Sequence, residues 1–276
     1  MNHVAATKQP GRVLAVFDLD KTIIDTSASM AYRRPMAERG LISTTELLRI
    51  AALLGSYMFT SHTDENLEAT KEALTSMIRN RDSATLRSIA EDALQEVIIP
   101  FVYTEARDFI AEHQKLGHAT AIITASASVL VAPIARELGA DHLIATELEE
   151  IDGKFTGNVL HFNKGQAKVD KLMELVDAKG YDLKASYAYS DSHTDLPMLE
   201  AVGHPYAVNP DRQLRKIALS RGWPVEFFSR PEPLFEPGKV LAGAGTIALA
   251  GAGTIALLGA VATGLTLWWK GREEGA

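Results

Sequence analysis

The feature that most constrains the fold is an apolar run at residues 13–17 that ends in two acids, Asp18 and Asp20, followed by Thr22. Five consecutive apolar residues are typical of a strand that is buried on both faces, as in a parallel sheet. Open α/β sheets bind their ligands at the carboxyl ends of such strands. Two carboxylates at that place repel each other unless a cation lies between them. The alternative is an acidic cap at the start of a helix, because Asp and Thr are both good helix caps.

The region after this strand is expected to be helical as far as about residue 100. Residues 43–46 have the pattern of a helix start, 64–79 and 83–97 are amphipathic, and no strand pattern interrupts the region. We therefore predict an all-helical cap at residues 26–100, inserted between the first strand and the rest of an α/β domain.

From residue 101 onward, strand and helix patterns alternate, which is typical of a domain with a parallel sheet. Asp152-Gly153 lies between two alternating segments and predicts a hairpin turn. Residues 13–25 and 101–221 are therefore expected to form an α/β core, a doubly wound, mostly parallel sheet of the Rossmann-like type. The strands are expected at residues 119–123, 142–144, 185–189 and 206–208, the hairpin at 147–159, and the helices at 104–116, 129–138, 165–178, 196–201 and 211–221.

The two ends of the chain differ in character. Residues 1–12 are polar and are expected to be a disordered N-terminus; they contain no apolar segment of the kind found in signal peptides, so we expect the core in the cytoplasm. Residues 222–239 contain four prolines and are predicted to be a linker. Thirty uncharged residues follow at 240–269, which is enough to span a bilayer, and 270–276 form a short tail. We predict a membrane protein with a single transmembrane helix near its C-terminus.

Two further features of this uncharged stretch favour a membrane location. Gly243, Gly251 and Gly259 recur every eight residues and fall near one helix face, which favours close packing of helices in lipid and predicts self-association. Trp268 and Trp269 have the character of an interfacial anchor. The alternatives are a glycine-rich low-complexity tail or a buried helix of the soluble domain, although a soluble core helix of this length would be unusual.

Composition excludes several classes of function. The net charge of −7 argues against nucleic acid as a partner, because nucleic-acid-binding proteins need a basic face. The chain has no cysteine, so disulfides, thiolate zinc sites and cysteine nucleophiles are all excluded. With no serine placed beside a histidine base, a carboxylate is the expected nucleophile.

Polar residues end three of the predicted strands, and parallel strands bring such ends to one edge of the sheet. Together they supply four carboxylates, an ammonium group and hydroxyls, which suit a divalent cation such as Mg²⁺ and a phosphate group. Mg²⁺ binds a few carboxylate oxygens and takes its other ligands from water and substrate phosphate. We therefore expect a Mg²⁺-dependent site for a phosphate ester. The residues are Asp18, Asp20, Thr124, Ser126, Lys168, Asp191 and Asp195.

The motifs resemble those of the haloacid dehalogenase superfamily of phosphohydrolases. The similarity rests on residues 18–22 (Asp-Leu-Asp-Lys-Thr), on residues 190–195 (Ser-Asp-Ser-His-Thr-Asp), on Thr124 and on Lys168, and it covers about residues 13–220. The helical insertion between the first and second motifs is similar to that of the phosphoserine-phosphatase-like branch, subfamily IB. The resemblance implies a phosphomonoesterase with a helical cap over a Rossmann-like core.

This resemblance also implies roles for the residues. Asp18 would attack phosphorus and form an aspartyl-phosphate, and Asp20 would protonate the leaving alcohol and then activate water. The Mg²⁺ ligands would be Asp18, Asp20 through its backbone carbonyl, and Asp191, with Asp195 beside them, and the phosphate-binding residues would be Thr22, Thr124, Ser126, Lys168 and Thr194.

Two departures from the phosphoserine phosphatase pattern bear on the substrate. Those enzymes carry a glutamate nine residues after the nucleophile that contacts the substrate amine, and Ser27 occupies that position here. Their second motif is usually Ser-Gly-Gly, whereas this chain has Thr124-Ala125-Ser126. Relatives with such motifs include phosphatidylglycerophosphate phosphatases, which would suit a catalytic domain tethered to lipid.

Three functions follow from these patterns. We favour a membrane-tethered hydrolase of a phospholipid-type phosphate such as phosphatidylglycerophosphate. The alternatives are a phosphatase of a small soluble metabolite similar to phosphoserine, and a non-catalytic, membrane-tethered binding domain. A binding domain has no need of an acid–base group at Asp20, which counts against the last alternative.

Overall fold

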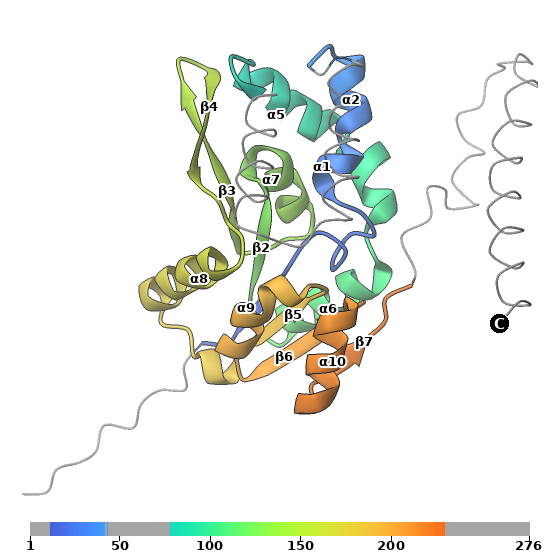
Figure 1. Cartoon of the computed structure of the whole chain (residues 1–276), viewed down its shortest axis with the longest axis vertical. Helices are drawn as coiled ribbons and strands as arrows, with labels where there is room; N and C mark the ends of the chain where they lie inside the picture. Colours follow the sequence, from blue (N-terminus) through green and yellow to red (C-terminus); the bar gives the residue numbers. More distant parts are fainter. Residues whose placement is uncertain (1–11, 42, 44–77, 230–276) are drawn as a thin grey trace, which may run out of the picture. The chain divides into compact units, whose positions relative to one another are not determined.

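The structure, a computed structural model, describes residues 12–41, 43 and 78–229 (Figure 1). The chain divides into two compact units, Met1–Leu234 and Phe235–Ala276. The second unit lies wholly outside the described residues, so the transmembrane helix at 240–269 and its glycine face stay predictions. The same holds for residues 1–11, for residues 44–46 of the predicted helix start at 43–46, and for residues 64–77 of the predicted cap helix at 64–79. In the part of the chain that is described, no helix is long and apolar enough to cross a bilayer.

A seven-stranded sheet forms the core, in the order β4-β3-β2-β1-β5-β6-β7. Neighbouring strands are parallel except β3 and β4, which form an antiparallel hairpin. This confirms the predicted α/β class with a mostly parallel sheet. The strands are β1 (Leu14–Phe17), β2 (Ala119–Ala127), β3 (His142–Ile151), β4 (Lys154–His161), β5 (Tyr187–Ser190), β6 (His204–Val208) and β7 (Val225–Glu226).

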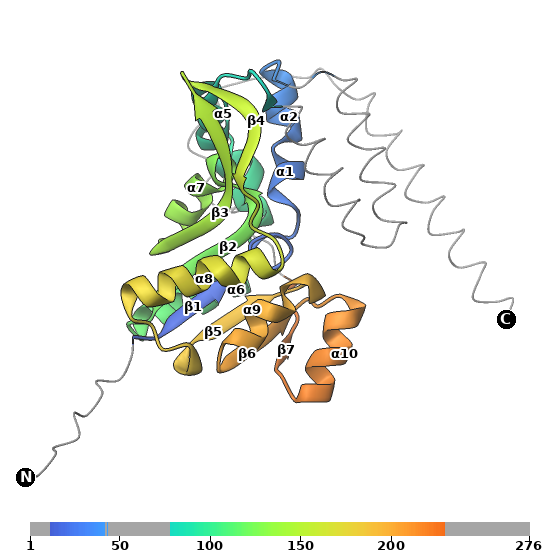
Figure 2. The same cartoon turned by 60° about the vertical axis from the view of Figure 1, so that its left-hand side comes forward.

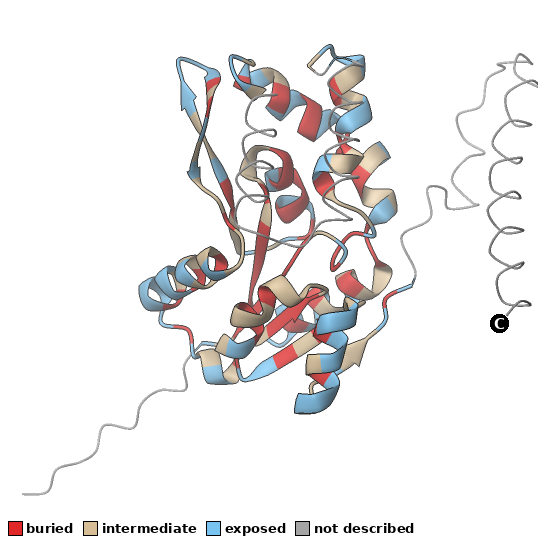
Figure 3. Ribbon diagram, in the orientation of Figure 1, coloured by how far each residue is buried: buried red, intermediate tan, exposed pale blue. Residues whose placement is uncertain are grey.

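Helices cover both faces of this sheet (Figure 2). Leu14 and Val16 of β1 belong to a buried cluster with residues of α8, α9 and α10, whereas Ala15 and Phe17 belong to a cluster with residues of α6 and α7. Burial on both faces is the reason for the uninterrupted apolar run of β1, and Figure 3 shows the central strands as largely buried. The helices are α6 (Thr104–Lys115), α7 (Ser128–Glu137), α8 (Gln166–Lys179), α9 (Leu196–Ala201) and α10 (Arg212–Arg221), with 3₁₀ turns η3 (Leu183–Ala185) and η4 (His193–Asp195).

The described part of the cap is helical and is joined to the hairpin of β3 and β4. The backbones of Asn80 and Arg81 exchange hydrogen bonds with Phe155 of β4, at 2.7 and 3.0 Å. Asp82 caps the helix that follows, because its carboxylate accepts a hydrogen bond from Thr85 N at 2.6 Å. The elements are α1 (Ala28–Ala31), α2 (Arg33–Glu38), α5 (Ser83–Asp92), the π-helical turn η1 (Leu94–Ile98) and the 3₁₀ turn η2 (Ile99–Phe101).

Three elements differ from the sequence prediction. β2 continues to Ala127, beyond the predicted end at residue 123, through a β-bulge. β3 is one strand of 10 residues rather than a short strand followed by a separate hairpin, although the turn at Asp152-Gly153 lies where it was predicted. β7 lies in the segment predicted to be a linker: it pairs with β6, and Phe228 after it is buried. The sheet therefore extends past residue 221.

Candidate active site

Asp18 lies buried at the carboxyl end of β1, and its carboxylate contacts the ammonium group of Lys168. Lys168 Nζ is 2.7 Å from Asp18 Oδ1 and 2.7 Å from Asp195 Oδ2, so one cation holds two carboxylates. Lys168 comes from the first turn of α8, and Asp195 comes from η4, directly after β5. Ser190 Oγ donates a further hydrogen bond to Asp195 Oδ2, at 2.8 Å. Three predicted site residues are thus brought together from distant parts of the chain.

Burial controls the charges of this cluster. Burial raises the pKa of Asp18, and the neighbouring ammonium group of Lys168 opposes that rise. Burial alone would lower the pKa of Lys168, but the carboxylates of Asp18 and Asp195 raise it above its ordinary value, so the ammonium group stays charged. The site therefore holds a fixed positive charge beside Asp18, which suits the binding of an anionic group.

The Asp20 carboxylate has a different set of partners. Its Oδ1 accepts a hydrogen bond from Ala28 N at 2.8 Å, at the start of α1, and its Oδ2 accepts one from Ser126 Oγ at 2.9 Å. Burial raises the pKa of Asp20, although these two hydrogen bonds oppose the rise. A carboxyl group with a raised pKa is suited to donating and accepting protons near neutral pH. Ser126, predicted to bind phosphate, is here a partner of the predicted acid–base group.

Thr22 lies in the tight loop that follows Asp20. Lys21 has a left-handed backbone, with φ of 62°, and its N–H donates to Thr26 O at 3.2 Å, so the loop turns back on itself. This turn brings the buried Thr22 Oγ1 to 3.4 Å from Asp18 Oδ2. The hydroxyl of the first motif is therefore next to the carboxylate of the same motif.

A β-bulge in β2 places Thr124. The register between β2 and β3 shifts in the segment that carries Thr124, so the regular ladder of hydrogen bonds is interrupted there. Two buried side chains replace the missing bonds: Thr146 Oγ1 donates to Ala125 O at 2.7 Å, and Asn163 Nδ2 donates to Thr124 O at 2.9 Å and to Ile144 O at 3.0 Å. Asn163 and Thr146 thus hold the backbone from which the Thr124 hydroxyl projects.

Sequence reasoning did not identify Asn163, Thr146 or Ser190. The position of Asn163 in the sequence could have pointed to it, because Asn163 comes two residues before Gly165, the N-cap of the helix that carries Lys168. Ser190 directly precedes Asp191 and was part of a quoted motif without a role of its own. Thr146 is one of several polar residues of β3, and nothing in the sequence of that strand marks it.

Asp191 follows β5, and its surroundings make its negative charge costly. Burial raises the pKa of Asp191 to about 7, and the charge of Asp195 adds to the rise. Asp211 holds the loop, because its N–H donates to Asp191 O at 2.8 Å. Thr194, predicted to bind phosphate, has its hydroxyl 3.0 Å from Ser192 Oγ in the same turn.

The donor set fits a divalent cation only in part. Among the described residues, no three acidic or histidine side chains are arranged as a set of metal ligands. Asp195 Oδ2 already accepts hydrogen bonds from Lys168 and Ser190. This oxygen is therefore better placed to hold Lys168 than to act as a direct metal ligand. Asp18 and Asp191 offer hard carboxylate oxygens, and a bound cation would lower the pKa of Asp191, which burial raises.

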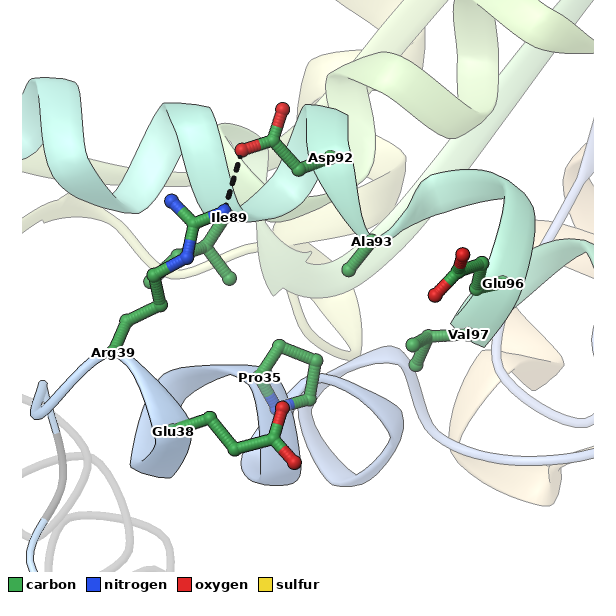
Figure 4. Close-up of a pocket in the computed structure, with 8 residues that line it drawn as sticks. All are labelled: Pro35, Glu38, Arg39, Ile89, Asp92, Ala93, Glu96 and Val97. Carbon is green, nitrogen blue, oxygen red and sulfur yellow. Dashed lines mark hydrogen bonds and ion pairs between the residues drawn. The ribbon is translucent and has the colours of Figure 1, made fainter. Parts of the chain in front are cut away.

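A groove outside this cluster lies in the cap, between α2 and the segment formed by α5 and η1 (Figure 4). Arg39 Nη2 and Asp92 Oδ2 form an ion pair across it, at 2.7 Å. Its charged lining consists of that pair and two further carboxylates, Glu38 and Glu96. It contains none of the predicted site residues.

Comparison with known proteins identifies relatives over most of the chain. A sequence model of the haloacid dehalogenase-like hydrolases matches residues 15–200. A probable phosphatase of Mycobacterium tuberculosis is 42% identical over 228 residues, which cover 83% of this chain and 79% of that protein. A phosphoserine phosphatase of the same organism is 32% identical over 219 residues, covering 78% of this chain and 70% of that one. A crystal structure of a protein of unknown function from Bordetella pertussis superimposes with a TM-score of 0.70, at 32% identity, covering 82% of this chain and 100% of that one.

Proposed function

This chain belongs to the haloacid dehalogenase-like hydrolase family and is a phosphatase, and we propose that it hydrolyses phosphate monoesters through a phosphate ester of Asp18. The observation that carries the proposal is the pairing of two aspartates with different partners, Asp18 buried and Asp20 half-buried. Asp18 is held by a lysine ammonium group, and Asp20 is held by a hydroxyl and a backbone N–H. The family assignment removes the alternative of a non-catalytic binding domain.

The first step forms a bond between a carboxylate oxygen of Asp18 and phosphorus while the bond from phosphorus to the leaving alcohol breaks. Asp20, in its protonated form, donates its proton to the departing oxygen. In the second step Asp20, now a carboxylate, removes a proton from water, and the water oxygen displaces Asp18 from phosphorus. Inorganic phosphate leaves, and both aspartates return to their initial states.

The other site residues bind the phosphoryl group and restrain the aspartates. Lys168 and the Thr124 hydroxyl would neutralise and hydrogen-bond its oxygens. Asp18, Asp191 and the backbone carbonyl of Asp20 would hold Mg²⁺, which supplies further neutralisation of the phosphoryl charge. Ser126 keeps the Asp20 carboxyl at the site between the two steps.

The mechanism is tested by trapping the phosphoenzyme. The full-length protein is mixed with an aryl phosphate and Mg²⁺, quenched in acid and weighed by mass spectrometry, and the parent should show one added phosphoryl group on the peptide of Asp18. Asp18→Asn should show none and should lose turnover, while its circular dichroism spectrum stays that of the parent. Turnover by this variant within tenfold of the parent would contradict the mechanism. Full activity in excess EDTA would contradict the Mg²⁺ requirement.

For the substrate we propose a phospholipid-type phosphate such as phosphatidylglycerophosphate, hydrolysed by a catalytic domain in the cytoplasm that is anchored by residues 240–269. The uncharged length of that segment and Ser27 in place of an amine-reading glutamate support this choice. Fractionation of cells tests the anchor, because full-length protein in the soluble fraction without detergent would contradict it.

A small soluble metabolite is the second candidate. It is favoured by the identity of 32% with a protein named phosphoserine phosphatase. A panel of soluble and lipid phosphate monoesters, each assayed with and without Mg²⁺, separates the two. Greater kcat/KM on phosphoserine than on any lipid phosphate would decide for the second candidate.

A further inference from the structure

One face of α10 combines exposed cations with exposed apolar side chains. Arg212, Arg215, Lys216 and Leu219 recur at intervals of three and four residues, so they share one side of the helix, and all four are exposed. Phe227 lies just past β7, which packs beside α10 (Figures 1 and 2), and the Arg215 guanidinium is 5.9 Å from the centre of its ring. Leu219 is 64% exposed and Phe227 is 63% exposed. These five residues are called the α10 face below.

Within residues 12–41, 43 and 78–229, the three cations of the α10 face have no acidic partner. Among the ion pairs formed by the residues that the structure describes, none includes Arg212, Arg215 or Lys216. Arg221, on the opposite side of the same helix, does pair, with Glu200. In a chain with a net charge of −7, this face is a local reversal of sign. Such a face attracts an anionic ligand or surface.

The α10 face begins next to the active site. The carboxylate of Asp211 caps α10 by accepting a hydrogen bond from Leu214 N at 2.7 Å, and it also accepts one from His193 N at 2.9 Å. The N–H of Asp211 donates to Asp191 O at 2.8 Å. Arg212 is therefore the next residue after Asp211, which contacts the loop of the proposed metal ligand Asp191. A ligand that docks at the Arg212 end of the α10 face lies close to the loop of Asp191.

The α10 face lies close in sequence to the predicted membrane segment. Twelve residues, 228–239, separate Phe227 from the uncharged stretch at 240–269. A chain of that length reaches at most about 40 Å when fully extended. A domain anchored by this stretch therefore stays within that distance of the bilayer.

We propose that the α10 face docks on a membrane surface that contains anionic phospholipids and so brings the active site to lipid phosphate groups. The inference rests on the phospholipid substrate proposed above. The three cations bind headgroup phosphates, and Leu219 and Phe227 enter the boundary between headgroups and acyl chains, which is the usual combination at interfacial surfaces. Electrostatic steering of a small soluble phosphate would use the cations but has no use for two exposed apolar side chains.

The absence of cysteine in the chain allows a direct test with a single spin label. Full-length Leu219→Cys carries a nitroxide, and the protein is added to vesicles of phosphatidylcholine or of an equal mixture of phosphatidylcholine and phosphatidylglycerol. Leu160→Cys is the matched control, because Leu160 is 66% exposed and lies on β4. Electron paramagnetic resonance measures how often each label collides with oxygen, which enriches in lipid, and with a polar nickel complex, which does not.

We expect the label at residue 219 to enter the apolar phase in anionic vesicles, while the label at residue 160 stays in water. A label at residue 219 that stays in water in both vesicle types overturns the proposal. The two vesicle types separate this failure from failure of the anchor. If the anchor alone is wrong, the protein does not float with phosphatidylcholine vesicles but still binds the anionic ones through the α10 face.

A charge variant separates docking from steering. Each Lys or Arg at an anionic surface contributes about a fivefold gain in binding, so Arg212→Gln, Arg215→Gln and Lys216→Gln together should weaken docking by about a hundredfold. In this triple variant the label at residue 219 should stay in water, and hydrolysis of a lipid phosphate in anionic vesicles should fall by about tenfold or more. Hydrolysis of a soluble aryl phosphate should not change. An equal loss on both substrates would show steering and would overturn the docking proposal.

Discussion

Asp18 and Asp20 are two residues apart, yet their partners give them different chemistry. Asp18 shares a lysine with a second carboxylate, whereas Asp20 accepts hydrogen bonds from a hydroxyl and a backbone N–H. Burial raises the pKa of both carboxyl groups; the Lys168 ammonium group is the main opposing influence at Asp18, and two neutral hydrogen-bond donors are the main opposing influence at Asp20.

Asp20→Asn should therefore slow the hydrolysis of an alkyl phosphate by about 10²- to 10⁴-fold, since it removes general acid catalysis. An aryl phosphate needs little protonation of its leaving group, so formation of the phosphoenzyme from it should slow much less. Rapid-quench kinetics with both substrates measures the difference, with Asp170→Asn, an exposed site, as the control. Equal slowing for both substrates would contradict the acid role.

Lys168→Met should destabilise the fold by about 3 kcal/mol at pH 7, because it leaves two buried carboxylates without a counter-charge. The loss should shrink as pH falls. In the variant the pKa of Asp18 is raised further above its unfolded value, so protonation favours the folded state below that pKa, and the penalty is full only above it. Urea unfolding at pH 7 and pH 5 measures this change. Lys171→Met removes an exposed pair with Glu174 and should change stability little at either pH.

At the scale of elements, the bulge of β2 links the phosphate-binding segment to residues far along the chain. Asn163→Asp keeps the size of the side chain but replaces a donor with an acceptor that faces two carbonyl groups. We expect a loss of about 1–3 kcal/mol in stability. If Asn163 positions Thr124, KM and the inhibition constant for inorganic phosphate should also rise, at the same pH and with Mg²⁺ saturating. Asn158→Asp, at an exposed amide on β4, is the matched control. A loss of stability with unchanged phosphate binding would contradict the positioning of Thr124 by Asn163 and would leave Asn163 with a structural role alone.

Elements marked by local patterns could be predicted from the sequence. β1 follows from its apolar run, and the hairpin turn follows from Asp152-Gly153, whose backbones both have positive φ. The extension of β2 could not, because it depends on hydrogen bonds from Asn163 and Thr146, which no local pattern of β2 reveals. β7 was missed because it has only two residues in a proline-rich segment, and its pairing with β6 is a tertiary contact.

For the site, the motif residues were predictable but their contacts were not. The strand ends placed Asp18, Asp20 and Asp191 at one edge of the sheet, as topology requires. That Lys168 holds Asp18 and Asp195 together, and that Ser126 bonds to Asp20, depends on side-chain geometry that spacing does not determine.

At the scale of the whole molecule, the sheet determines where the chain can be shortened. A chain that ends at residue 229 keeps β7 and the buried Phe228, which contacts Tyr103 and Phe109. We expect it to fold, to stay in solution and to hydrolyse soluble substrates. A chain that ends at residue 221 loses the ring of Phe228 from the core and should be less stable by about 3–5 kcal/mol. Thermal unfolding of the two proteins compares them, and equal melting temperatures would contradict a structural role for residues 222–229.

The attachment of the cap to the hairpin has a consequence for building chimeras from members of this family. The chain passes from core to cap and back again through two neighbouring segments. There Ile24 and Val102 form an isolated β-bridge, and Tyr103 N donates to Ile23 O at 2.9 Å. A third attachment, through the backbone of Phe155, ties the cap to β4. A transplant cut at the two connections alone would separate the cap from its hydrogen bonds with β4. The exchangeable module is the cap together with the tip of the β3–β4 hairpin, and a graft that carries both across should inherit the substrate preference of its donor intact.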